Sequence, residues 1–197
     1  VGIVTKSALV VRDIDILGPM AARGLAKVCV SVTTLDREIA RTLEPRAPTP
    51  MRRIETLRHL SEAGIPTGVM AAPMIPGLTD AELENILSAA RGAGAQFASY
   101  IMLRLPLEIG ALFAEWLRTH QPGRAARVFS LMRQSRGGKI YETKFGKRML
   151  GSGPYAELLE QRFDSACRRF GFSDKRGALD TTAFRRPARS GDQMELF

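Results

Sequence analysis

Polar side chains occur at the ends of apolar segments in this 197-residue sequence, where a parallel sheet would place a binding site. Lys6 closes the first apolar segment, Ser31 and Thr33 close the second, and Arg104 closes the fourth. An ammonium group and hydroxyl groups that meet at strand ends suit a small zwitterionic ligand that carries a sugar. The third segment contributes small side chains and backbone at the same position, Ala71, Ala72 and Pro73.

The apolar segments and the helical patterns between them define the expected fold. We predict strands at residues 2–7, 27–34, 66–75 and 96–104. Thr49 is a candidate N-cap with Pro50 at the first helical position, and Thr79 and Glu82 have the spacing of a capping box. Strands that alternate with helices predict βα units and a parallel sheet.

The second strand favours a barrel over an open sheet. Cys29, Ser31 and Thr33 share one of its faces, whereas an open sheet covered by helices on both sides needs apolar residues on both faces. We therefore predict an α/β fold, a partial parallel β/α barrel whose carboxyl-end rim carries the site. The alternative is that the strand ends are polar only because loops begin there.

The chain divides by composition into three parts. Residues 1–105 hold the predicted βα units, 106–172 form a basic helical extension, and 173–197 have the polar composition of a flexible tail.

No apolar run approaches the ~20 residues of a membrane span. Cys29 and Cys167 lie far apart and indicate no disulfide framework, so we expect a cytoplasmic location.

The net charge of +9 is concentrated in one segment. Residues 1–117 carry twelve basic and twelve acidic side chains, whereas residues 118–148 carry nine Lys or Arg against Glu142 alone. Aromatic residues able to stack on bases are interleaved with these cations: Phe129, Tyr141 and Phe145. The segment is a candidate nucleic-acid footprint, and the alternative is a solvated helix face whose aromatic residues pack inward.

Four stretches of the sequence carry a family resemblance. They are "TKS" (5–7), "SVTTLD" (31–36), "LEPRAPTPMRRIETLRHLSEAGIP" (43–66) and "VMAAPMIPGLTD" (69–80). Together they resemble the later part of a radical S-adenosylmethionine (radical SAM) barrel, in particular the spore photoproduct lyase-like proteins. The resemblance covers roughly residues 1–150. It implies an enzyme that reduces SAM with a four-iron, four-sulfur (4Fe-4S) cluster, so that an adenosyl radical abstracts a hydrogen atom from substrate.

The resemblance also implies roles for individual residues. Lys6 would bind the carboxylate of SAM, and Ser31 its ribose hydroxyls. Apart from the resemblance, the polar face of the second strand makes Thr33 a further candidate contact. The adenine would lie beside the backbone of Ala71, Ala72 and Pro73. For Glu44 and Arg46 the alternatives are a pair across the proline-rich loop, a ligand contact or an ordinary surface pair.

One motif of the family is missing. Its members ligate the cluster with three cysteines spaced C-x3-C-x2-C, and this sequence has no such motif. Because the first residues have the pattern of a strand interior, we expect a fragment that is inactive alone and whose cluster ligands lie upstream. The alternative is a homologue that lost its cluster.

Two further groups of residues indicate partners. Arg104, Tyr141 and Lys144 are candidate substrate-binding residues, Arg104 because it ends a strand on the predicted rim. The C-terminal QMELF resembles the Q-L-x-L-F peptide by which bacterial DNA-maintenance proteins bind the replication sliding clamp. Its predicted contact residues are Gln193, Leu196 and Phe197. The alternative is a tail folded back on its own barrel.

The sequence therefore predicts the C-terminal part of a lyase-like radical SAM iron–sulfur enzyme that acts on nucleic acid, in DNA repair or modification. One alternative is a non-catalytic nucleic-acid or sliding-clamp adaptor on a decayed barrel. Another is a cofactor-free or metal-dependent β/α-barrel lyase. His59 and His120 have no partner at ligand spacing, so no metal site is predicted within these residues.

Overall fold

The computed structural model describes residues 1–141, 143, 147–173 and 179–182. This part of the chain contains a four-stranded sheet in which every neighbouring pair of strands is parallel. In spatial order the strands are β1 (Gly2–Thr5), β2 (Lys27–Val32), β3 (Thr67–Met74) and β4 (Phe97–Met102). Spatial order equals sequence order, and helices connect successive strands, so the predicted α/β fold of a partial β/α barrel is confirmed.

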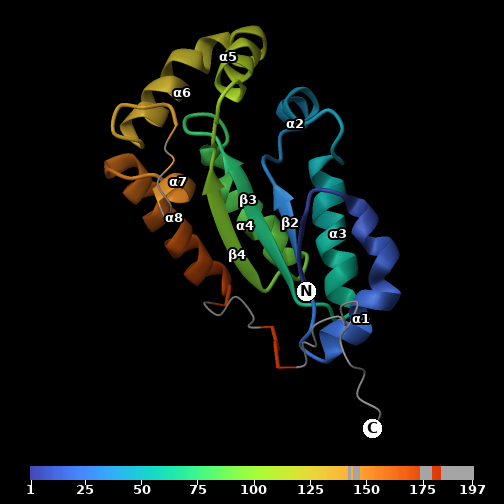
Figure 1. Ribbon diagram of the computed structural model, residues 1–197. Helices are drawn as coiled ribbons and strands as arrows, with labels where there is room; N and C mark the ends of the chain where they lie inside the picture. The colour runs from blue at the N-terminus through green and yellow to red at the C-terminus, as the bar shows by residue number, and fades with distance from the viewer. Residues whose placement is uncertain (142, 144–146, 174–178, 183–197) are drawn as a thin grey trace, which may run out of the picture.

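Helical segments follow each strand. After β1 come η1 (Ala8–Asp13) and α1 (Ile14–Ala22), and after β2 come α2 (Arg37–Leu43) and α3 (Pro50–Glu62). After β3 come η2 (Asp80–Glu82) and α4 (Leu83–Gly92). After β4 come α5 (Ile109–His120), α6 (Pro122–Gln134), α7 (Lys147–Leu150) and α8 (Pro154–Phe170). Figure 1 shows α3 and α4 behind the sheet, α8 beside β4, and α2, α5 and α6 at the carboxyl end of the strands.

The alternating side chains of β2 show which face of the sheet is covered by helices. Val28, Val30 and Val32 have no exposed surface and pack into a core that includes Leu57 of α3 and Ile86 of α4. The intervening residues of β2 point to the opposite face, which is turned toward the viewer in Figure 1. The polar edge of that second face at the carboxyl end is where the site is expected.

The sequence predicted hydrogen-bonded caps at the starts of two helices, and the structure confirms one of them. Thr49 caps α3 as predicted, since its side chain accepts a hydrogen bond from the Arg52 amide at 3.4 Å. The capping box predicted for Thr79 and Glu82 is wrong: the Glu82 carboxylate instead accepts a hydrogen bond from the Leu35 amide at 2.7 Å. A tertiary partner therefore replaces the local one.

Helix α2 was not expected within the stretch predicted to be a loop. The Asp36 carboxylate caps it by accepting hydrogen bonds from the amides of Glu38 and Ile39 at 2.7 and 3.1 Å. Ile39 then packs with Ile75 in a second apolar cluster, which also contains residues of α5 and α6. The loop of prolines is thus only the short link between α2 and α3.

The helix at the end of the predicted extension packs against the sheet layer. Leu159 of α8 belongs to the same core as α3 and α4, and the Arg162 guanidinium pairs with the Glu84 carboxylate of α4 at 2.7 Å. The Tyr155 hydroxyl donates to Asp80 Oδ2 at 2.6 Å.

No helix in the described part of the chain combines the length and apolar character that crossing a bilayer requires.

Candidate active site at the carboxyl end of the sheet

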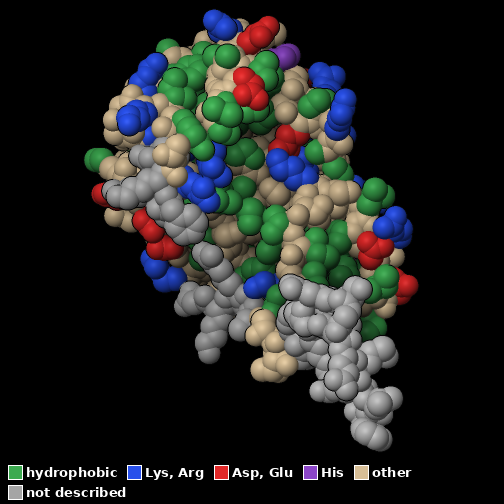
Figure 2. Space-filling view, in the orientation of Figure 1, with side chains coloured by type: hydrophobic (Ala, Val, Ile, Leu, Met, Phe, Trp, Pro, Cys, Tyr) green, Lys and Arg blue, Asp and Glu red, His purple; other side chains and the backbone are tan. Residues whose placement is uncertain are grey.

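A cavity of about 280 Å³ opens at the carboxyl end of the sheet. Its lining residues come from the ends of all four strands: Lys6, Ser31, Ala72, Pro73, Ile101, Met102, Leu103 and Arg104. Figure 2 shows this face of the molecule hollowed, with Lys and Arg side chains on both sides of the hollow. Five of the lining residues are ones that the sequence singled out: Lys6, Ser31, Ala72, Pro73 and Arg104.

Lys6 reaches the cavity from the end of β1. Its ammonium group forms an ion pair with Oε1 of Glu44, which caps the C-terminal end of α2. The Lys6 side chain is 39% exposed, whereas that of Glu44 is only 11% exposed. Lys6 is therefore the more exposed member of the pair, and it is the one that lines the cavity.

Glu44 has a second cationic partner, Arg53 of α3. Arg53 Nη2 lies 2.5 Å from Glu44 Oε2, and the arginine side chain is 2% exposed. Its other donors reach backbone oxygens, Nε to Pro48 at 3.0 Å and Nη1 to Ser31 at 3.2 Å. One buried guanidinium thus ties the end of α2, the proline loop and β2 together.

The hydroxyl groups predicted at the site are largely occupied within the protein. Ser31 Oγ donates to the Ala72 carbonyl at 2.8 Å, and Thr33 Oγ1 lies 2.9 Å from both that carbonyl and Glu44 Oε1. Ser31 lines the cavity, whereas Thr33 is 1% exposed and does not. Ala71 is fully buried in the core on the helix side of the sheet and does not line the cavity either.

The charge state of Glu44 follows from these contacts. Burial raises the pKa of its carboxyl, but hydrogen bonds and charge from Lys6 and Arg53 outweigh burial, so the pKa lies below its ordinary value. Glu44 is therefore ionised at neutral pH. Two cations and one carboxylate leave the group with a net charge of +1, and Lys6 is its exposed member.

Arg104 and Tyr141, both predicted to bind substrate, meet at the opposite end of the cavity. Arg104 Nη2 donates to Tyr141 Oη at 3.2 Å, and the guanidinium carbon lies 5.9 Å from the centre of the tyrosine ring. Arg104 Nε is buried and has no hydrogen-bond acceptor among the described residues. None of the ion pairs in the described ranges includes Arg104, so its charge is available to an anion.

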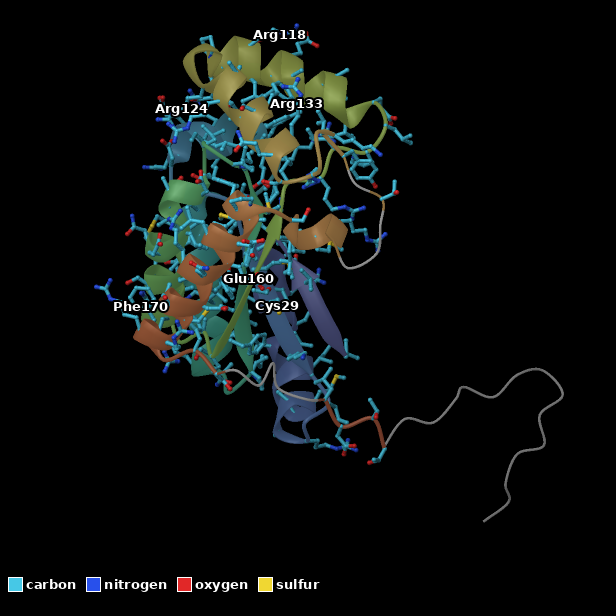
Figure 3. All side chains as sticks on the ribbon, turned by 90° about the vertical axis from the view of Figure 1, so that its left-hand side faces the viewer. Cys29, Arg118, Arg124, Arg133, Glu160 and Phe170 are labelled. Carbon is cyan, nitrogen blue, oxygen red and sulfur yellow. The ribbon has the colours of Figure 1, made fainter. Side chains whose placement is uncertain are left out.

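The basic segment presents exposed cations, but Phe129, one of its three predicted stacking residues, packs inward. Arg118, Arg124 and Arg133 are exposed and extend from separate points of the α5–α6 pair (Figure 3). Phe129 instead packs edge-on against Phe113, with ring centres 6.3 Å apart, in the cluster beneath these helices. For Phe129 the inward-packing alternative is therefore correct. The remaining candidates Lys144, Phe145, Gln193, Leu196 and Phe197 lie outside the described residues.

Metal ligands are not gathered in the described part of the chain. It contains no group of three or more His, Cys, Asp or Glu side chains arranged to hold a metal ion. Cys29 lies on the sheet, as Figure 3 shows, and neither it nor Cys167 of α8 is in a disulfide. The residues present here do not fit an iron–sulfur cluster, and no step through one is assigned to them.

Arg53 is the site residue that the sequence pattern missed. It lies one helical turn before Leu57 and two before Leu60, which are fully buried, so it belongs to the stripe of α3 that faces the sheet. A buried arginine on an apolar stripe needs a hydrogen-bond acceptor of opposite charge, and the Glu44 carboxylate is that acceptor. The pairing of Glu44 with Arg46 across the loop does not occur, and Arg46 is exposed.

Comparison with known proteins supports the barrel assignment for the first half of the chain. Residues 1–90 match the family model described as Radical SAM superfamily. A protein of Mycobacterium tuberculosis, Rv2578c, is 31% identical over 134 residues, which cover 67% of this chain but 39% of the relative. ORF301 of Acidianus two-tailed virus is 40% identical over 72 residues, covering 36% of this chain and 23% of the relative.

A further match extends the range of organisms. MJ0683 of Methanocaldococcus jannaschii is 32% identical over 80 residues, which cover 41% of this chain and 30% of that protein. All three relatives are described as uncharacterized proteins. The chain therefore matches less than half the length of each of these curated relatives.

Proposed function

We propose that the cavity between Lys6 and Arg104 binds S-adenosylmethionine, as part of a radical SAM enzyme related to the spore photoproduct lyases. The observation that carries the proposal is that Lys6, Ser31 and Ala72 reach one cavity from the ends of three strands. The match of residues 1–90 to the Radical SAM superfamily supports the same class of enzyme.

The donor set of the cavity fits this cofactor. An ammonium group has three N–H donors, so the bond from Lys6 to Glu44 leaves two for the carboxylate of a ligand. Ser31 Oγ gives its hydrogen to Ala72 but keeps a lone pair that can accept from a ribose hydroxyl. Pro73 and Ile101 supply apolar surface for an adenine ring.

The residues of the chain bind and orient the reactants. SAM would be held by Lys6, Ser31 and the backbone of Ala72, and when bound it would supply radical chemistry to the substrate. Lys6 would hold the methionine end of the cofactor by its carboxylate and so orient the bound molecule. Arg104, on the other side of the cavity, holds an anionic group of the substrate close to that position.

Nucleic acid is the substrate class that the charges favour, in DNA repair or modification. Arg104 has no carboxylate partner in the described residues, and Tyr141 beside it offers a ring for stacking. The exposed arginines of α5 and α6 suit interactions with phosphates along a strand.

The full-length protein tests the proposal by anaerobic reconstitution with iron and sulfide. We expect a brown protein that cleaves SAM under reduction. Lys6→Met should keep the cluster absorbance and bind SAM at least about tenfold more weakly, because the variant cannot form the charge-assisted hydrogen bond. Lys27→Met, at the amino end of β2, is the matched control and should bind normally. A colourless protein that neither binds nor cleaves SAM would support the adaptor instead.

A sliding-clamp interaction through Gln193, Leu196 and Phe197 is proposed as a separate property of the C-terminal peptide. Its two apolar anchors follow a polar stretch, as expected for a peptide that fills a pocket on another protein. Deletion of residues 193–197 should abolish capture by the purified clamp. Equal capture of the truncated and intact proteins would exclude the interaction.

A further inference from the structure

We infer that Glu44 and Arg53 position Lys6 for the carboxylate of the ligand, an inference that rests on the proposed function. Neither residue lines the cavity, and both act on it through Lys6. They are positioning residues, because the lysine ammonium is the member of the group that would touch the ligand.

The geometry starts from a buried guanidinium with acceptors on several sides. Arg53 is held by three acceptors from different parts of the chain, the carbonyls of Ser31 and Pro48 and the carboxylate of Glu44. Its side chain is only 2% exposed, so its donors face the protein and not solvent. The position of Arg53 therefore fixes Oε2 of Glu44, and the carboxylate plane then fixes Oε1, the acceptor for Lys6.

Thr33 makes the same arrangement more rigid. Its hydroxyl lies 2.9 Å from Glu44 Oε1, the oxygen that Lys6 also contacts. Both oxygens of the carboxylate are thus held by the protein, one by the residue that follows β2 and the other by α3. A lysine side chain has a flexible stem of four carbons and is poorly ordered by itself, so an anchored acceptor sets where its ammonium lies.

The net positive charge of the Lys6, Glu44 and Arg53 group lies on its exposed member. Glu44 neutralises Arg53, which is buried, and the remaining unit charge lies on Lys6, which is 39% exposed. The ligand therefore meets a single, oriented cation with two unused N–H donors. This arrangement suits one carboxylate, and it keeps Glu44 in place when the ligand binds.

A charge-balanced variant separates positioning from electrostatic attraction. Glu44→Gln together with Arg53→Met removes one negative and one positive charge, so the charge near the cavity is unchanged. The double variant also avoids the buried unpaired charge that Glu44→Gln alone would leave, so it should fold. Circular dichroism checks the fold before binding is measured.

The probe is SAM, titrated calorimetrically into the reconstituted full-length protein under anaerobic conditions. We expect the double variant to bind about 5- to 10-fold more weakly than wild type, because a disordered lysine must be ordered on binding. In a Lys6→Met background the same two changes should cause no further loss, since the group they position is gone. Arg52→Met with Glu55→Gln, an exposed pair on the same helix, is the matched control and should bind as wild type.

Each outcome decides one of the two claims. Wild-type affinity or tighter binding in the double variant overturns the inference, and tighter binding identifies Glu44 as a competitor for Lys6. An equal loss in the Lys6→Met background also overturns it, because the pair would then act by another route. If the wild-type protein binds no SAM, the proposed function fails and the inference fails with it.

Discussion

Arg53 of α3 and Glu44 at the end of α2 form an ion pair at 2.5 Å in which the arginine is 2% exposed. The pair lies directly behind Lys6, the cation that faces the cavity. It joins two helices and the proline loop to the carboxyl end of β2. The stability of this corner and the geometry of the site therefore depend on the same carboxylate.

Glu44→Gln should destabilise the fold strongly. The change leaves the Arg53 guanidinium buried without a countercharge, and breaking such a pair costs about 3–5 kcal/mol. Urea denaturation followed by circular dichroism measures the free energy of unfolding. Glu55→Gln removes an exposed carboxylate of α3 and should cost less than about 1 kcal/mol. Equal stability of the two variants would show that the Glu44–Arg53 pair is not structural.

The same carboxylate gives stability a defined pH dependence. The pKa of Glu44 is lowered in the folded state from its ordinary value of 4.5. A group with a depressed folded pKa contributes its full stability above the unfolded pKa and loses it as the pH falls through the folded pKa. We therefore expect wild type to lose free energy of unfolding below pH 4.5 more steeply than the Glu44→Gln, Arg53→Met variant. Parallel curves for the two proteins would contradict this assignment.

The Phe97 ring lies so close to Gly68 that a side chain at this position should destabilise the sheet. A Cβ atom at Gly68 would lie 2.1 Å from the Phe97 ring, so Gly68→Ala forces the ring to move. We expect a loss of about 1–3 kcal/mol by overpacking. Gly92→Ala, at the end of α4 with no atom within 4 Å of the new Cβ, should be neutral or slightly stabilising. Urea denaturation of both proteins provides the comparison, and a neutral Gly68→Ala would exclude the clash.

The strand ends could be predicted because local sequence carries their signal. Valines alternate with Cys29 and Ser31 along β2 and with Thr33 directly after it, and that period fixes which side chains share a face. The partner of Arg53 could not be predicted, because Arg53 lies on α3 and Glu44 at the end of α2, and only the packed structure brings them together. The same limit applies to Phe129, whose inward orientation depends on Phe113 of the preceding helix.

Nucleic-acid binding should depend on salt and on the exposed arginines of α5 and α6. For a single-stranded DNA oligonucleotide, each phosphate that the protein no longer neutralises should reduce the slope of log affinity against log salt by about 0.7. Combined Arg118→Gln, Arg124→Gln and Arg133→Gln changes should therefore lower the slope, whereas Arg58→Gln on α3, behind the sheet, should not. Fluorescence anisotropy at several salt concentrations measures the slopes. Affinity that does not vary with salt would exclude a phosphate footprint.

The position of bound SAM tests the central claim most directly. In a crystal structure of the full-length protein with SAM, the account predicts the ligand carboxylate within about 2.7–3.2 Å of Lys6 Nζ and the adenine beside Ala72 and Pro73. Glu44 should remain paired with Arg53. SAM bound in another cavity, with Lys6 bonded to Glu44 alone, would contradict the account.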